Sequence, residues 1–61
     1  MKDLTEKAVK ILDLLYDAKA LLEDIEESEL YDEVQYIIHA FKLEMIERED
    51  LTQEQKDLIY N

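Results

Sequence analysis

The chain has 61 residues, contains no Gly, Pro or Cys, and carries 17 acidic against 7 basic side chains, for a formal net charge of −10. The lack of Gly and Pro favours helices throughout, the lack of Cys excludes disulfides and Cys-ligated zinc, and the acidic excess disfavours direct nucleic-acid binding because it repels phosphate. A chain this short builds only a small core, so we expect it to gain stability by associating with a second copy.

The first predicted helix covers about residues 4–26. Asp3 and Glu6 have the spacing of a capping box at its start. Apolar residues then recur every three or four positions, and flanking leucines widen this stripe enough to contact more than one neighbouring helix. The members of the stripe are Leu4, Ala8, Ile11, Leu15, Ala18, Leu22 and Ile25.

A second helix is predicted over about residues 29–49. Continuing the first stripe at about 100° per residue would place Glu29 and Asp32 in the core, so the pattern breaks between the two helices. Ser28 lies in this break and is the expected N-cap of the second helix. The sequence therefore predicts a helical hairpin, with one bent continuous helix as the alternative because the turn contains no Gly. The main apolar stripe of this helix is Leu30, Val34, Ile37, Phe41 and Met45.

A third, short helix is predicted over about residues 53–60, where Thr52 and Gln55 have capping-box spacing. The second helix is apolar on most sides, which indicates more than one packing partner. We therefore expect an all-α single domain over residues 1–61, associating as a homodimeric four-helix-type bundle, with a monomeric three-helix bundle as the alternative. The expected core and dimer interface consists of Leu15, Leu22, Leu30, Val34, Ile37, Ile38, Phe41 and Met45.

The residue inventory disfavours an enzyme. Ser28 and His39 are the only Ser and His; the first is assigned to a cap and the second to the polar side of its helix. Calcium and phosphate loops need Gly, and Tyr36 occupies the position where a Glu-x-x-His motif would need Glu. We expect no catalytic residue, no metal and no cofactor. Apolar runs of at most three residues and an acidic polar face predict a cytoplasmic protein without membrane contact.

The acidic residues are unevenly distributed. Glu23 and Glu27 repel each other at i,i+4, and acids near the end of the first helix oppose its dipole. Such departures from local rules are expected at functional sites, although acids also serve solubility. Residues 23–33 contain no basic residue and seven acids: Glu23, Asp24, Glu26, Glu27, Glu29, Asp32 and Glu33.

We interpret these seven residues as a binding surface for a basic partner protein. Its carboxylates could stand in for the phosphates that a nucleic-acid-binding partner normally holds, and the protein would then be a non-enzymatic regulator or inhibitor, of a kind that suits a phage or mobile element. Tyr16, Tyr31 and Tyr36 could supply anchors in such a contact. The alternative is a structural or adapter bundle that docks a partner helix through its apolar face, with the acids serving solubility.

Overall fold

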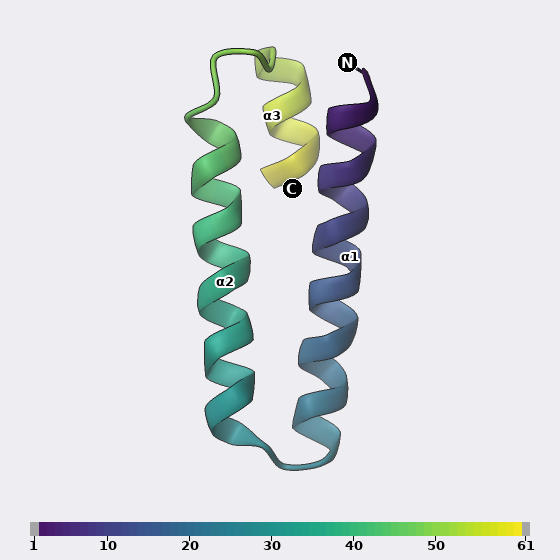
Figure 1. The fold of residues 1–61 in the computed structure, drawn as a ribbon, viewed down its shortest axis with the longest axis vertical. Helices are drawn as coiled ribbons and strands as arrows, with labels where there is room; N and C mark the ends of the chain where they lie inside the picture. Colours follow the sequence, from purple (N-terminus) through teal and green to yellow (C-terminus); the bar gives the residue numbers. More distant parts are fainter. Residues whose placement is uncertain (1, 61) are drawn as a thin grey trace.

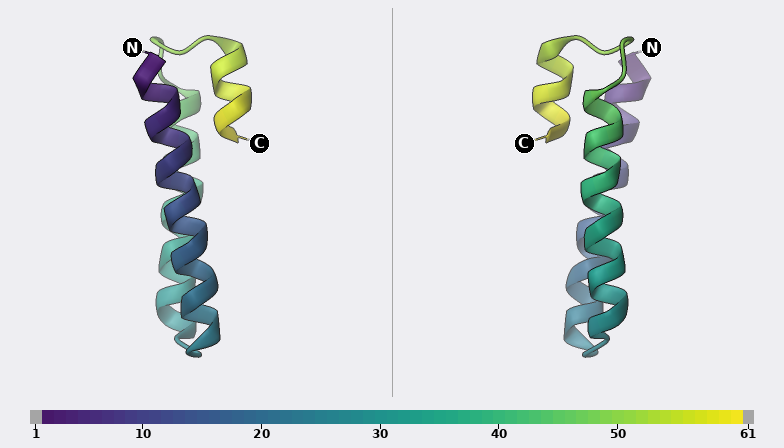
Figure 2. Two further views of the ribbon diagram at one scale, coloured as in Figure 1. Left: turned by 90° about the vertical axis from the view of Figure 1, so that its right-hand side faces the viewer. Right: turned by 90° about the vertical axis from the view of Figure 1, so that its left-hand side faces the viewer.

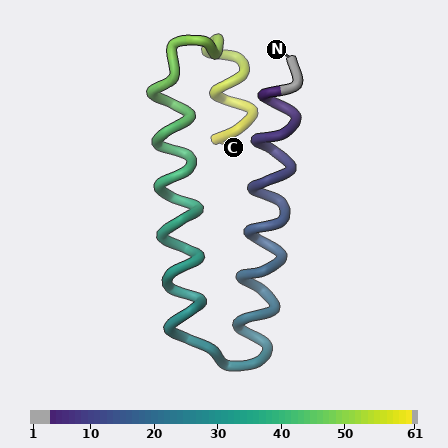
Figure 3. The backbone as a smooth tube through the Cα atoms, viewed as in Figure 1, coloured from purple at the N-terminus to yellow at the C-terminus, as the bar shows by residue number. Residues whose placement is uncertain are grey.

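The chain folds into an antiparallel helical hairpin with a short third helix packed against it. A computed structural model describes residues 2–60, with side chains described for residues 4–60. The helices are α1 (Lys2–Asp24), α2 (Ser28–Ile46) and α3 (Gln53–Tyr60), and the described residues form no strand (Figure 1). The molecule measures 38 × 17 × 15 Å. The backbone trace shows α3 running back along the hairpin at the end opposite the α1–α2 turn (Figure 3). The all-helical prediction and the hairpin are confirmed.

The turn between α1 and α2 is built by backbone hydrogen bonds. The N–H of Glu27 donates to the carbonyl of Leu22 and that of Glu26 donates to the carbonyl of Glu23, both at 3.0 Å. This is the paired bonding of a Schellman motif, which places Glu26 in the left-handed region with a φ of 63°. Glu27 occupies the N-cap of α2 without a side-chain cap bond, and Ser28 is already the first helical residue. The prediction that Ser28 is the N-cap is therefore wrong, because the Schellman turn closes one residue earlier.

The segment between α2 and α3 ends in a capping box. α2 ends at Ile46, three residues before the predicted end, and the N–H groups of Glu47 and Arg48 satisfy carbonyls of its last turn. At the start of α3, the backbone N–H of Thr52 donates to Gln55 Oε1 at 2.8 Å, and the N–H of Gln55 donates to Thr52 Oγ1 at 3.2 Å. The predicted capping box at Thr52 is confirmed. The one predicted at Asp3 depends on a side chain outside the described ones.

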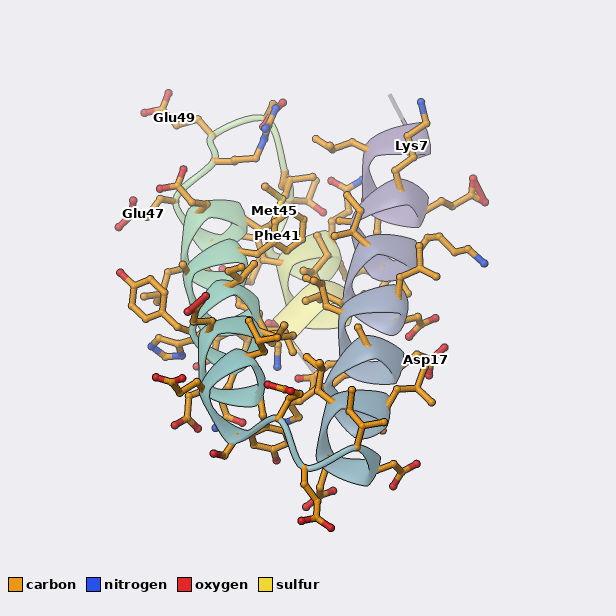
Figure 4. The ribbon with its side chains drawn as sticks, turned by 60° about the horizontal axis from the view of Figure 1, so that its bottom comes forward. Lys7, Asp17, Phe41, Met45, Glu47 and Glu49 are labelled. Carbon is orange, nitrogen blue, oxygen red and sulfur yellow. The ribbon has the colours of Figure 1, made fainter. Side chains whose placement is uncertain are left out.

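The core lies at the α3 end of the hairpin. Leu4, Val9, Leu15, Val34 and Phe41 pack against it while half-buried. Phe41 and Met45 extend from α2 into the space between the helices (Figure 4). No residue between positions 13 and 37 is fully buried, because α3 does not reach the turn half of the molecule. The six buried residues are Ala8, Leu12, Ile38, Met45, Leu51 and Ile59.

The buried side of α2 is rotated relative to the apolar stripe seen in the sequence. Ile38 and Met45 are buried as expected, but Leu30 and Ile37 are 45% and 49% exposed. Adjacent helical residues point about 100° apart, so packing against α3 turns the buried side toward Ile38 and leaves Ile37 in contact with solvent. Leu30 and Ile37, which were predicted for the core or dimer interface, are thus exposed in one chain, and Leu22 is half-buried. Their place in a dimer interface stays a prediction.

None of the helices in the described part of the chain has the length and apolarity needed to cross a membrane.

Candidate functional site at the acidic turn

A hollow opens at the turn between α1 and α2. Five residues line it: Glu23, Glu26, Glu27, Ser28 and Tyr31, around a volume of ≈ 210 Å³. The end of α1 supplies Glu23, the turn supplies Glu26 and Glu27, and the first turn of α2 supplies Ser28 and Tyr31. Three of its lining residues are thus acidic, one is aromatic and none is basic.

The backbone that places Glu26 in this hollow is strained. A residue with a Cβ atom pays about 1–2 kcal/mol to adopt the left-handed conformation, and a Gly would adopt it freely. The Schellman motif needs one residue in this conformation, and the sequence places Glu there. The carboxylate of Glu26 is therefore held at the turn at a cost in stability.

The seven acids of the predicted surface, residues 23–33, are all exposed. None of the hydrogen bonds or ion pairs found among the described side chains includes one of them. The nearest base in sequence is Lys19, which donates to Gln35 Oε1 at 3.1 Å. Its Nζ also lies 5.3 Å from the centre of the Tyr16 ring and 5.4 Å from that of Tyr31. Lys19 is thus engaged with α1 and α2 side chains rather than with the acids.

The structure divides five of the seven predicted acidic residues between two hollows. Glu23, Glu26 and Glu27 share the hollow with Tyr31. Asp32 and Glu33 line a second, more open hollow on α2 with Tyr36 and Ile37, of ≈ 350 Å³. Asp24 and Glu29 are exposed and line neither hollow. The structure therefore brings three of the seven acids together around one aromatic ring.

Exposed apolar side chains accompany the acids at this end of the molecule. Leu21 and Ile25 are 64% and 66% exposed, and Leu30 follows directly after the turn. The sequence pattern assigned Ile25 to the packed stripe of α1 and Leu30 to that of α2. Their exposure follows from the position of α3, which covers only the far half of the hairpin. The acidic turn is therefore an amphipathic surface.

The opposite end of the molecule carries a compensated pair of charges. Arg48 donates from Nε to Asp50 Oδ1 at 2.9 Å and from Nη2 to Asp50 Oδ2 at 2.7 Å. This bidentate hydrogen bond raises the pKa of the Arg48 guanidinium and lowers the pKa of the Asp50 carboxyl. Both side chains are solvent-exposed, so this pair contributes little stability.

Two further observations bear on the chemistry of the described residues. His39 is exposed and lines a hollow with Lys19, Lys42 and Gln35, where no acid accompanies it. Within residues 2–60, no three His, Cys, Asp or Glu side chains are grouped so that they could hold a metal ion.

Comparisons with models of protein families, with curated proteins and with solved structures find no match to this chain.

Proposed function

We propose that this protein is a non-enzymatic interaction module that binds a basic partner protein through its acidic turn and acts as a regulator or inhibitor of that partner. The observation that carries this proposal is the hollow formed by Glu23, Glu26, Glu27 and Tyr31 without a basic side chain. An Arg side chain from a partner satisfies both features of the hollow at once. Its guanidinium forms charge-assisted hydrogen bonds with carboxylates and stacks on an aromatic ring.

The strain and repulsion at the turn support this proposal. Glu26 adopts a left-handed conformation that Gly would adopt more easily, and Glu23, in the last turn of α1, lies at the helix end where the dipole disfavours an acid. Both arrangements destabilise the folded chain, and a bound cation relieves the repulsion. A sequence selected for stability alone would avoid them, whereas a sequence selected for binding gains from them.

The chemistry of the surface indicates the class of partner. Three acidic residues surround the ring of Tyr31 in the hollow, which suits a partner that presents Arg or Lys. Uncompensated acids accelerate association with a basic surface over long distance. Basic surfaces of this kind bind nucleic acid, so the carboxylates of this protein would compete with phosphates.

A short Arg-rich peptide containing Leu provides a defined probe. We expect NMR shift changes on titration to concentrate between Glu23 and Tyr31, and the affinity to fall steeply between 50 and 300 mM salt, on the order of tenfold or more. Shift changes spread evenly over all acidic residues would contradict the proposal, since they would indicate general charge attraction without a site.

A pair of charge-matched variants isolates the hollow. One changes Glu23, Glu26 and Glu27 to Gln; the control changes Glu44, Glu47 and Glu54 to Gln, which are exposed and lie toward the other end of the hairpin. Both variants lose three negative charges. We expect the first to weaken peptide binding about tenfold, or about 1.4 kcal/mol, and the control by less than about threefold. An equal loss of peptide affinity in the two variants would indicate that the acids serve solubility.

A second candidate function rests on a different observation. Large apolar side chains remain exposed on the hairpin, including Leu14 and Ile37, so an adapter role in which this surface docks another helix also has structural support. The two functions differ in salt dependence, because apolar docking holds or strengthens as salt rises. The homodimeric four-helix-type bundle expected from the sequence would use the same apolar side chains, and it forms part of the proposal.

A further inference from the structure

The hairpin has one face that α3 covers and one that it leaves bare. Figure 2 shows α3 on one side of the α1–α2 layer, with no helix on the other side. On α1, the residues Val9, Leu12 and Tyr16 line a hollow with Leu58 and Ile59 of α3, so they mark the covered face. Helical residues two positions apart point about 200° apart. The bare face of α1 is therefore formed by the residues two positions away from these.

The bare face carries an apolar stripe on each helix. On α1, Ile11 lies on the side of the helix opposite Val9, and Leu14 on the side opposite Leu12. Further apolar residues follow on this bare side at intervals of three or four positions. On α2, Gln35 and His39 line a hollow together with Lys42. The Nζ of Lys42 lies 5.5 Å from the centre of the Tyr60 ring in α3, so Gln35 and His39 mark the side of α2 that faces α3. Residues of α2 two positions away from Gln35 and His39 therefore lie on the bare face. The resulting stripes are Ile11, Leu14, Ala18, Leu21 and Ile25 on α1, and Leu30 and Ile37 on α2.

The bare face is large enough for a stable interface. Six of its Leu and Ile residues are between 42% and 66% exposed. Together they present on the order of 500 Å² of contiguous apolar surface, at the upper end of what a monomer of ordinary size exposes. With a rim of polar residues, the buried area would approach the roughly 800 Å² per partner of a standard interface. This molecule has a total accessible surface of 4916 Å², of which the patch is about a tenth, the share that a standard interface takes of a small protein.

Acidic side chains are concentrated at the turn end of the hairpin, where residues 23–33 carry seven acids and no base. Lys7, in the first half of α1, projects from the end of the hairpin away from the turn (Figure 4). The direction of a second copy on the bare face therefore decides whether two acidic turns meet or lie apart.

We propose that a second copy of this chain covers the bare face, with its hairpin antiparallel to the first. A parallel pair would place two acidic turns side by side, and repulsion disfavours it. The antiparallel pair buries both apolar stripes, with α1 packed on α1 and α2 on α2 of the second copy about the two-fold axis. In this arrangement the two turns lie at opposite ends of the dimer, each with its hollow free. The functional consequence rests on the proposed function of the acidic turn. The dimer is then a bivalent ligand for basic partners.

Single Cys variants determine the orientation directly, since the chain contains no Cys. Leu14 lies near the middle of the bare face and Ile25 at its turn end. In the antiparallel dimer, spin labels on Leu14→Cys lie close together, whereas labels on Ile25→Cys lie about 30 Å apart at a rise of 1.5 Å per residue. Short distances at both positions would indicate a parallel dimer. A mass of 7.3 kDa at high micromolar concentration would overturn the dimer and leave the face to another protein.

The dimer and the acidic turn can be tested separately. Leu14→Lys places a charge at the centre of the bare face, on a side chain already exposed in one chain, so it should yield a folded monomer. We expect this monomer to bind the Arg-rich peptide as tightly per chain as the parent. Normal peptide binding without any parent dimer would refute the dimer alone, and a parent dimer without localised peptide binding would refute the role of the turn.

Discussion

Replacing Glu26 by Gly should stabilise this protein while weakening its binding. Glu26 has a φ of 63°, and the two hydrogen bonds that close the turn use backbone atoms of Leu22, Glu23 and residues 26 and 27 only. Gly keeps both bonds. It also removes a steric cost of about 1–2 kcal/mol from the folded state. The greater conformational freedom of Gly in the unfolded chain lowers the unfolding free energy by about 0.5–1 kcal/mol. Relief of charge repulsion at the turn adds a few tenths of a kcal/mol.

The expected net gain is about 1 kcal/mol, which corresponds to a rise in melting temperature of about 4–8 °C for a domain of this size. Thermal and urea denaturation followed by circular dichroism measure it, at a fixed protein concentration because dimerisation adds to apparent stability. Glu26→Gln serves as the matched control, since it removes the charge and retains the strain. We expect the control to gain only a few tenths of a kcal/mol.

A second control places Gly where the backbone is helical. Glu23→Gly also removes an acid from the hollow, but in α1 it should lower the unfolding free energy by about 1 kcal/mol. Peptide binding should weaken in all three variants. The reasoning fails if Glu26→Gly is no more stable than Glu26→Gln, because the left-handed conformation would then carry no measurable strain.

Substitutions at four further positions test the packing of the helices and the cap of α3. Ile38→Ala should lower the unfolding free energy by about 2–4 kcal/mol, whereas Ile37→Ala should cost less than about 1 kcal/mol in dilute solution, and similar values in denaturant titrations would show that the buried side of α2 is misassigned. Thr52→Ala should cost about 1 kcal/mol by removing the cap of α3, while Thr52→Ser should retain most of it; a stable Thr52→Ala variant would mean that α3 does not depend on its capping box. Ile59→Ala should detach α3 and expose Leu12 and Met45, detectable as accelerated amide exchange in α3 ahead of α2; unchanged exchange would contradict the packing of α3 on the core.

The sequence alone determined the features that depend on near neighbours in the chain. The apolar periodicity and the absence of Gly and Pro predicted three helices, and the break in periodicity predicted the hairpin. The capping box at Thr52 was also predictable, because its two reciprocal bonds join residues three positions apart. The exposure of the acids followed from the high cost of burying unpaired charge.

Parts of the candidate site were not readable in this way. The acids could be listed from the sequence, but their division into a hollow around Tyr31 and a second hollow around Tyr36 depends on how the turn closes. The sequence contains no Gly to mark the left-handed residue, so neither the position of Glu26 nor the early start of α2 at Ser28 could be derived from it.

Only the tertiary structure decided which side of each helix is buried. Ile37 and Ile38 are identical residues in adjacent positions, and Ile11 and Leu12 are both large and aliphatic, so each helix offers two candidate apolar sides about 100° apart. The placement of α3 selects between them. It brings Leu51 and Ile59 against Leu12 and leaves the opposite stripe in solvent. Burial is a property of the contacts between helices, and those contacts are set by a segment more than forty residues away from Leu12 in the chain.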